Sequence, residues 1–117
     1  MLYTRWAVQP EFDVGLETLP DGRTVLRVRG ELDMATTPRA EQALAEAGTP
    51  STLVVDLSEC TFVDSAAVRF LSETARRVEA AGGRTSIVAT DPGVLRVLEI
   101  TALDTMLPVH PTLDVLL

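Results

Sequence analysis

One short apolar segment limits what this chain can fold into more than any other feature. Residues 53–57 read Leu-Val-Val-Asp-Leu, so that only Asp56 interrupts the run. Such a run is typical of a strand in the middle of a parallel sheet, where both faces are covered. Parallel neighbours need long crossover connections, which are usually helices. The segment therefore predicts an α/β domain in which helices pack on a central strand.

Two alternating segments precede this run. Residues 12–19 and 24–29 alternate apolar with polar side chains, which is the period of a half-buried strand. The Pro-Asp-Gly sequence at residues 20–22 is a turn signal, because Pro presets φ and Gly accepts a positive φ. The two segments therefore predict an antiparallel hairpin at the start of the sheet.

Capping signals predict three helices. The first has Thr37 as its N-cap with proline next, and Gly48 closes it. The second runs over residues 65–81 with Asp64 as its N-cap, since the carboxylate can accept from the free amides of the first turn. The third begins at Asp91 by the same logic.

Three further segments complete the expected topology. Residues 85–89 predict a second buried strand, parallel to residues 53–57, and residues 106–109 predict a short last strand. Residues 111–117 suggest a terminal helical turn. The later order β-α-β-α-β implies parallel strands, so the early hairpin makes the sheet mixed.

Length and charge limit the classes of protein to which this chain can belong. At 117 residues the chain is expected to form one domain, residues 1–117. The net charge of −7 repels nucleic acid and anionic membrane surfaces, whereas a basic protein partner would be attracted. The sequence contains no apolar run long enough to span a membrane and no signal peptide, so we expect a cytoplasmic protein.

The residues that enzymes use are scarce. All ten basic residues are Arg, which excludes a Schiff-base lysine and a P-loop lysine. With one cysteine, Cys60, and one histidine, His110, neither a disulfide nor a zinc cluster can form, and we expect no metal or cofactor. We expect Cys60 to be buried and inert, and Trp6 either to seal an edge of the core or to be an exposed contact. A phosphocarrier or enzyme that uses His110 remains the alternative of a different class.

The Asp64-Ser65 pair follows an apolar segment, residues 61–63, at the point where function collects in open α/β sheets. Two interpretations of this spacing stay open. The pair is an ordinary helix cap, or Ser65 is a modification site whose phosphate would be received by the helix N-terminus. Asp56, if buried, needs hydrogen bonds. We expect it to accept from backbone amides in a loop at residues 58–64 and to support Ser65.

Four segments in order resemble the STAS-domain anti-sigma-factor antagonists of bacteria, also called anti-anti-sigma factors. They are Val-Arg-Gly-Glu-Leu-Asp at residues 28–33, Val-Val-Asp-Leu-Ser at 54–58, Phe-Val-Asp-Ser at 62–65 and Ala-Ala-Gly-Gly at 80–83. The resemblance extends over about residues 12–109, nearly the whole chain.

The resemblance implies a regulatory binding protein and not an enzyme. In that family the unphosphorylated antagonist binds an anti-sigma factor that is also a serine kinase, which frees the sigma factor for transcription. The kinase then phosphorylates the serine after the motif aspartate, which is Ser65 here, and a serine phosphatase resets the antagonist. The partner-binding surface implied for this chain comprises Asp33, Asp64, Ser65, Ala66 and Arg69.

One departure from the family pattern follows Ser65. The family usually has a small residue and then glycine, whereas this chain has Ala66 and Ala67. Alanine favours helix, but an added methyl group can obstruct close approach of the kinase. The alternative within the family is a STAS subunit of a transporter or signalling complex that acts without phosphorylation.

Overall fold

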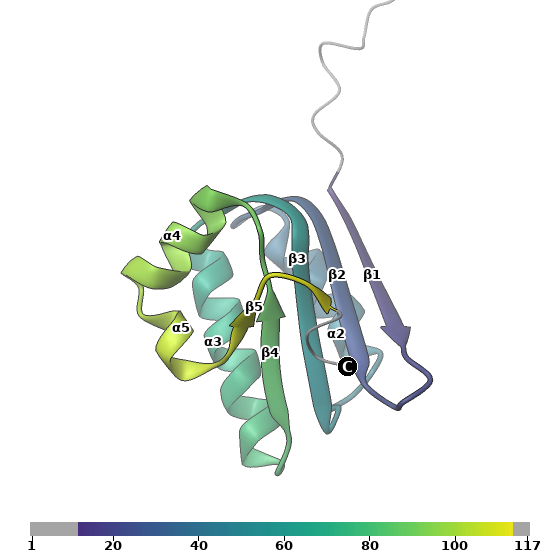
Figure 1. The fold of residues 1–117 in the computed structure, drawn as a ribbon. Coiled ribbons are helices and arrows are strands. Elements are labelled where there is room, and N and C mark those ends of the chain that lie inside the picture. The colour runs from purple at the N-terminus through teal and green to yellow at the C-terminus, as the bar shows by residue number, and fades with distance from the viewer. Residues whose placement is uncertain (1–11, 114–117) are drawn as a thin grey trace, which may run out of the picture.

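The computed structural model describes residues 12–113 and contains one mixed sheet in the strand order β1-β2-β3-β4-β5 (Figure 1). The strands are β1 (Asp13–Thr18), β2 (Thr24–Leu32), β3 (Thr52–Val63), β4 (Arg84–Val88) and β5 (Val109–His110). The helices are α2 (Thr37–Ala45), α3 (Ser65–Ala80), α4 (Pro92–Ile100) and α5 (Leu103–Met106). The β1–β2 pair is the predicted antiparallel hairpin, and the other three pairs are parallel.

The central position predicted for residues 53–57 is confirmed. These residues belong to β3, which pairs with β2 on one side and β4 on the other. Leu53 lies beside Thr85 in the parallel register, and α3 connects the two strands. The α/β prediction from this run therefore holds.

The helices cover only one face of the sheet, because α2, α3 and α4 all contribute to the same core (Figure 1). Leu53, Val55 and Leu57 point into this core and are fully buried. The other face, which we call the open face, carries no helix within residues 12–113. There Val54 packs in a second small cluster whose other fully buried members are Val25 and Val88.

Strand β3 is longer than the sequence predicted. Residues 58–61, expected in a loop, continue the strand, with Ser58 and Glu59 both exposed. The register with β2 shifts between Arg27 and Arg29, which marks a bulge. A bulge breaks the strict alternation of a strand, so the polar Ser-Glu pair is accommodated without ending it.

Two element boundaries also differ from the prediction. Thr36, not Thr37, is the N-cap of α2, because the Thr37 hydroxyl donates to the Asp33 carbonyl oxygen and Thr37 is buried. Met106, predicted in a strand, ends the short helix α5, which follows Ala102 at φ 61°. The N-caps Asp64 and Asp91 are confirmed, each accepting from a first-turn amide.

The terminal helical turn expected up to residue 117 and the position of Trp6 lie wholly or partly outside the described residues. Among helices in the described part of the chain, none has the length and apolar character of a membrane span.

Candidate functional site

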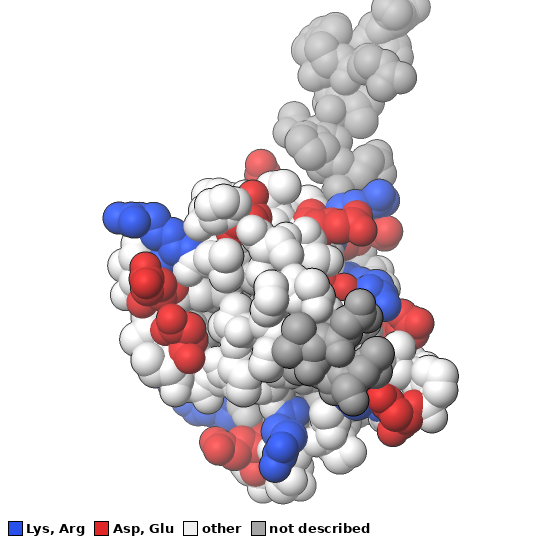
Figure 2. Space-filling view, in the orientation of Figure 1, with Lys and Arg blue, Asp and Glu red and all other residues white. Residues whose placement is uncertain are grey.

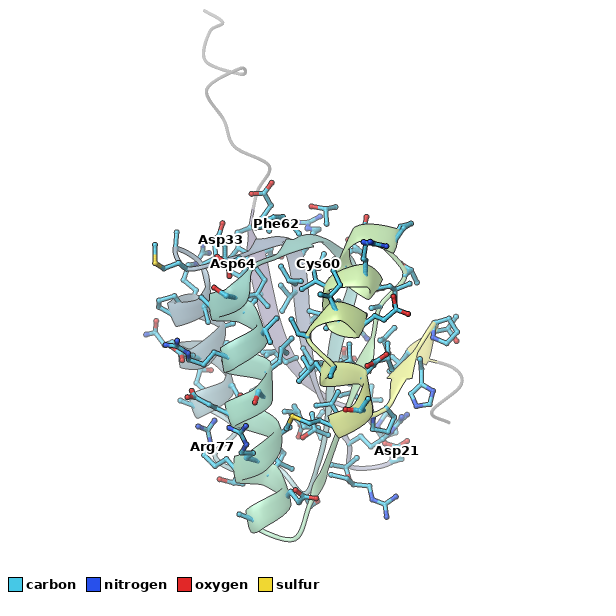
Figure 3. All side chains as sticks on the ribbon, turned by 90° about the vertical axis from the view of Figure 1, so that its left-hand side faces the viewer. Asp21, Asp33, Cys60, Phe62, Asp64 and Arg77 are labelled. Atoms are coloured by element: carbon cyan, nitrogen blue, oxygen red, sulfur yellow. The ribbon has the colours of Figure 1, made fainter. Side chains whose placement is uncertain are left out.

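The carboxyl ends of β2 and β3 lie side by side and bring two separate loops together. Leu32 pairs with Val63, so the turn after β2 adjoins the start of α3. The backbone N–H of Asp64 donates to the carbonyl oxygen of Leu32 at 3.3 Å. Two of the sequence-predicted site segments, around Asp33 and around Ser65, therefore meet at one end of the molecule (Figure 3).

The Asp64 carboxylate fastens these two segments to each other. Its Oδ1 accepts from the backbone N–H of Ala67 at 3.0 Å, which caps α3. Its Oδ2 accepts from the backbone N–H of Met34, also at 3.0 Å. Because one side chain makes both contacts, the start of the helix and the neighbouring turn have a fixed relative position.

Asp33 organises the turn itself. Its Oδ1 accepts from the backbone N–H groups of Ala35 and Thr36, at 2.9 and 3.0 Å. The Thr36 hydroxyl accepts from the Asp33 N–H and donates to the carbonyl oxygen of Glu31. Asp33 thus shapes the loop beside Ser65, as an aspartate in a tight turn commonly does.

Ser65 is the first residue of α3 and is exposed. Within residues 12–113 no hydrogen bond holds its hydroxyl. The first turn of a helix presents backbone N–H groups and the positive end of the helix dipole, so it accommodates an anion. The hydroxyl is therefore accessible to an enzyme, and a phosphate attached to it would not oppose the fold.

Three predicted neighbours of Ser65 lie on the first turns of α3. Ala66 is half-buried, and Arg69 is exposed one turn beyond Ser65, where residues four apart face each other. Ala67 is fully buried in the core. The Ala67 methyl group, at the position where the family usually has glycine, therefore points into the core and not toward the exposed surface around Ser65.

Two apolar side chains beside this site were missed by sequence reasoning. Met34 is 77% exposed and Phe62 is 47% exposed, and both are large apolar side chains. Met34 follows Asp33 in the turn, and Phe62 lies opposite Glu31 near the end of β3 (Figure 3). The alternation within residues 61–63 could have identified Phe62, since Val63 points inward and its neighbour must point outward.

Asp56 does not support Ser65 as predicted. It is buried on the open face, where its Oδ2 accepts from Nη1 of Arg27 at 2.7 Å. The expected bond to a backbone amide exists, because Oδ1 accepts from the N–H of Ser58 at 3.0 Å. The ion pair joins two adjacent strands on the side of the sheet away from α3, so its role is to stabilise the β2–β3 pair.

Cys60 and His110 are also placed. Cys60 is buried, its thiol donates to the Phe62 carbonyl oxygen at 3.3 Å, and burial raises the pKa of the thiol. The burial of Cys60 agrees with the prediction, and its low reactivity stays a prediction. His110 lies on β5 and is half-buried. Residues 12–113 contain no group of three or more side chains that could hold a metal ion.

Comparison with known proteins gives one family. The model of the STAS domain matches residues 16–116. The anti-sigma-F factor antagonist RsfA of Mycobacterium tuberculosis is 30% identical over 98 residues, which cover 80% of this chain and 77% of that protein.

Solved structures agree with this result. An anti-sigma factor antagonist from Mycobacterium paratuberculosis is 35% identical, covers 92% of each chain and superposes with a TM-score of 0.82. The antagonist SpoIIAA in its unphosphorylated form superposes with a TM-score of 0.74 at 23% identity, over 89% of this chain and 93% of that one. At that identity the likeness concerns the fold alone.

Proposed function

The chain belongs to the STAS-domain family, and on this premise we propose that it is an anti-sigma factor antagonist switched by phosphorylation of Ser65. In the unphosphorylated state it binds an anti-sigma factor that is also a serine kinase, and so releases a sigma factor. Transfer of phosphate from the kinase's ATP to the Ser65 hydroxyl ends the interaction, and a serine phosphatase restores it.

One observation carries the proposal: an exposed serine hydroxyl stands at a helix start that Asp64 holds against the neighbouring turn. A kinase needs a hydroxyl that it can reach, and a partner needs a surface of fixed shape. Both requirements are met at Ser65 without any change in the core.

The surface around Ser65 also fits a protein partner. We call Met34, Phe62 and Ser65, together with Asp33, Asp64, Ala66 and Arg69, the contact surface; these residues lie on the turn after β2, at the end of β3 and on the first turns of α3. Exposed apolar side chains next to charged ones are typical of binding hot spots and their rims. With Glu31, Asp33 and Asp64 close by, a complementary partner would be apolar at its centre and basic opposite these carboxylates, and it would carry an acidic group opposite Ser65 and the exposed Arg69.

Phosphate on Ser65 would act through charge. A phosphoserine carries about −1.5 to −2 charges near neutral pH. If the partner has one acidic group about 6 Å away in a medium of dielectric constant about 40, the repulsion is about 2–3 kcal/mol. That corresponds to a loss of affinity of roughly 30- to 150-fold. The helix N-terminus and Arg69 would keep the phosphate compatible with the domain's own fold.

The experiment is a titration of the cognate anti-sigma kinase, with and without ATP and magnesium, against the parent chain, Ser65→Ala and Ser65→Asp. We expect the parent to lose affinity and gain one phosphate in the presence of ATP. Ser65→Ala should stay bound and unmodified, and Ser65→Asp should bind more weakly without ATP.

Ser58→Ala is the matched control, because Ser58 is an exposed serine on the same strand that leads to Ser65. It should behave like the parent. Binding that ignores ATP would instead support the STAS adaptor that acts without phosphorylation. Phosphate on Ser58 or Thr61 would show that the assignment of Ser65 is wrong.

A further inference from the structure

Of the residues that form the contact surface, all within residues 12–113, Arg69 alone carries a positive charge. The other charged members are two carboxylates, Asp33 and Asp64. Arg69 lies on α3 one turn beyond Ser65, and both side chains are exposed. The single cation of this surface therefore lies beside the residue proposed to be phosphorylated.

Arg69 has no acidic partner within residues 12–113, where the ion pairs are made by Arg23, Arg27 and Arg29. Acidic groups are nevertheless frequent, because the chain has 17 acidic residues, and they occur on several parts of the surface shown in Figure 2. Glu73, four residues further along α3, is exposed and forms none of these ion pairs. The Arg69 guanidinium is therefore free to bind an anion that is added to the surface.

The geometry of an α-helix directs the Arg69 side chain toward Ser65. The Cα–Cβ bonds tilt toward the helix N-terminus, so a helical side chain covers the surface of the preceding turn. Residues four apart have their Cβ atoms about 5–6 Å apart, and an anion that precedes a cation at this spacing is the more favourable order. A phosphate on Ser65 would have this order with Arg69, whereas Glu73 has the reverse order.

The Asp64 carboxylate makes a cation necessary beside such a phosphate. It accepts from the backbone N–H groups of Ala67 and Met34, so it cannot turn away from Ser65 without losing both hydrogen bonds. A phosphate on Ser65 would therefore add its charge next to a fixed carboxylate. The planar guanidinium of an arginine binds phosphate through charge-assisted hydrogen bonds and would offset this repulsion.

We propose that Arg69 changes partners when Ser65 is phosphorylated, an inference that rests on the proposed function. In the unphosphorylated chain, Arg69 binds an acidic group of the anti-sigma factor. A phosphate on Ser65 pairs with the Arg69 guanidinium within α3, and the anti-sigma factor loses that contact. One modification thus adds about −1.5 to −2 charges to the contact surface and also neutralises its cation.

The first measurement uses the full chain alone. Phosphoserine is incorporated at residue 65 during translation of the isotopically labelled protein, and the Nε–Hε signal of Arg69 is followed by NMR. We expect the phosphate to move this signal downfield and to slow its exchange with water, because a charge-assisted hydrogen bond forms. The signal of Arg76, which is exposed on the same helix, should not change. An unchanged Arg69 signal would overturn the proposed pair.

The second measurement is the affinity for the cognate anti-sigma factor of the parent and of Arg69→Gln, each with serine or phosphoserine at residue 65. Phosphate should weaken binding of the parent at least about threefold more than binding of Arg69→Gln, because the variant has no cation left to neutralise. Arg69→Lys keeps the charge and should restore most of this difference. Arg76→Gln removes the same charge from elsewhere on α3 and should behave like the parent.

The outcomes separate this inference from the proposed function. If phosphate leaves the affinity of the parent unchanged, the switch at Ser65 is wrong and this inference fails with it. If phosphate weakens the parent and Arg69→Gln equally, the switch stands and the proposed role of Arg69 is wrong. A larger loss in Arg69→Gln would mean that Arg69 only screens the phosphate, which also overturns this inference.

Discussion

The carboxylate of Asp64 accepts a hydrogen bond at 3.0 Å from the backbone N–H of Met34, thirty residues earlier in the chain. The same carboxylate caps α3 through Ala67. An ordinary N-cap stabilises one helix, whereas this one also sets the position of the turn that carries Asp33 and Met34. The geometry of the proposed contact surface therefore depends on Asp64, whose side chain is half-buried.

Because of this double role, removing the Asp64 cap should destabilise the domain more than removing the Asp91 cap. Asp64→Ala loses two hydrogen bonds and should lower the free energy of unfolding by about 2 kcal/mol. Asp91→Ala is the control, because within residues 12–113 the Asp91 carboxylate accepts only from the first turn of α4, and it should cost about 1 kcal/mol. Urea unfolding of both variants measures the difference. Equal losses would mean that the contact with Met34 contributes nothing.

Removing the exposed apolar side chains should weaken partner binding and spare the fold. Met34→Ser and Phe62→Thr should each reduce affinity for the anti-sigma factor about tenfold or more, as hot-spot truncations do. Met34→Ser should change the free energy of unfolding by less than about 1 kcal/mol, since that side chain is 77% exposed. Phe62→Thr should cost about 1–2 kcal/mol, because about half of the Phe62 side chain is buried. Ile100→Ser, at a position 68% exposed on α4, is the control and should bind like the parent.

The ion pair between Arg27 and Asp56 should matter for stability and not for binding. Arg27→Met leaves a buried carboxylate without its cation and should cost about 1–2 kcal/mol, less than a fully buried pair because the Arg27 side chain is 46% exposed. The double variant Arg27→Met with Asp56→Leu should recover part of that loss. Thermal unfolding and partner titration test both points; a large loss of affinity would restore the role first expected for Asp56.

A methyl group at Gly83 should destabilise the domain. A Cβ there would lie 2.4 Å from the carbonyl oxygen of Ser51 and 2.9 Å from Cγ1 of Val78, so the backbone would have to move. Gly83→Ala should cost about 1–3 kcal/mol. Gly15→Ala, where nothing lies within 4 Å, should be neutral or slightly stabilising. A neutral Gly83→Ala in urea unfolding would contradict this close approach of the loop before β3.

Cys60 gives a prediction about pH. Its pKa is raised by burial above the ordinary value of 9.0, so the neutral thiol is the form that the folded state favours. The associated stability is present below pH 9 and is lost as pH rises through the folded-state pKa. Iodoacetamide should react slowly with the folded protein at pH 8 and readily in urea. Fast reaction in the folded state would show that the thiol is accessible.

N-cap residues and hydrophobic periodicity correctly predicted those parts of the fold that are determined by residues close together in the sequence. Asp64 and Asp91 were found because an aspartate before an apolar helical pattern has few other roles. Thr36 was missed by one position, because the hydrogen bonds that Asp33 and Thr36 exchange decide where α2 starts, and no pattern in the sequence encodes that exchange.

The features that the sequence did not predict depend on residues far apart in the chain. The bulge that keeps Ser58 and Glu59 within β3 arises from the register with β2. The partner of Asp56 is Arg27 on the adjacent strand, and the exposure of Met34 and Phe62 follows from how two strand ends meet. Ser65 was identified as a candidate because the cap before it was recognisable; its apolar neighbours required the three-dimensional arrangement.

The residues of the contact surface are absent from the hydrophobic core. Mutation can therefore alter Met34, Phe62 or the surroundings of Ser65 while the domain goes on folding. After gene duplication, two copies of such a chain can come to recognise different partners without passing through a variant that fails to fold. Several signalling circuits built on this one scaffold can thus become insulated from one another within a single cell.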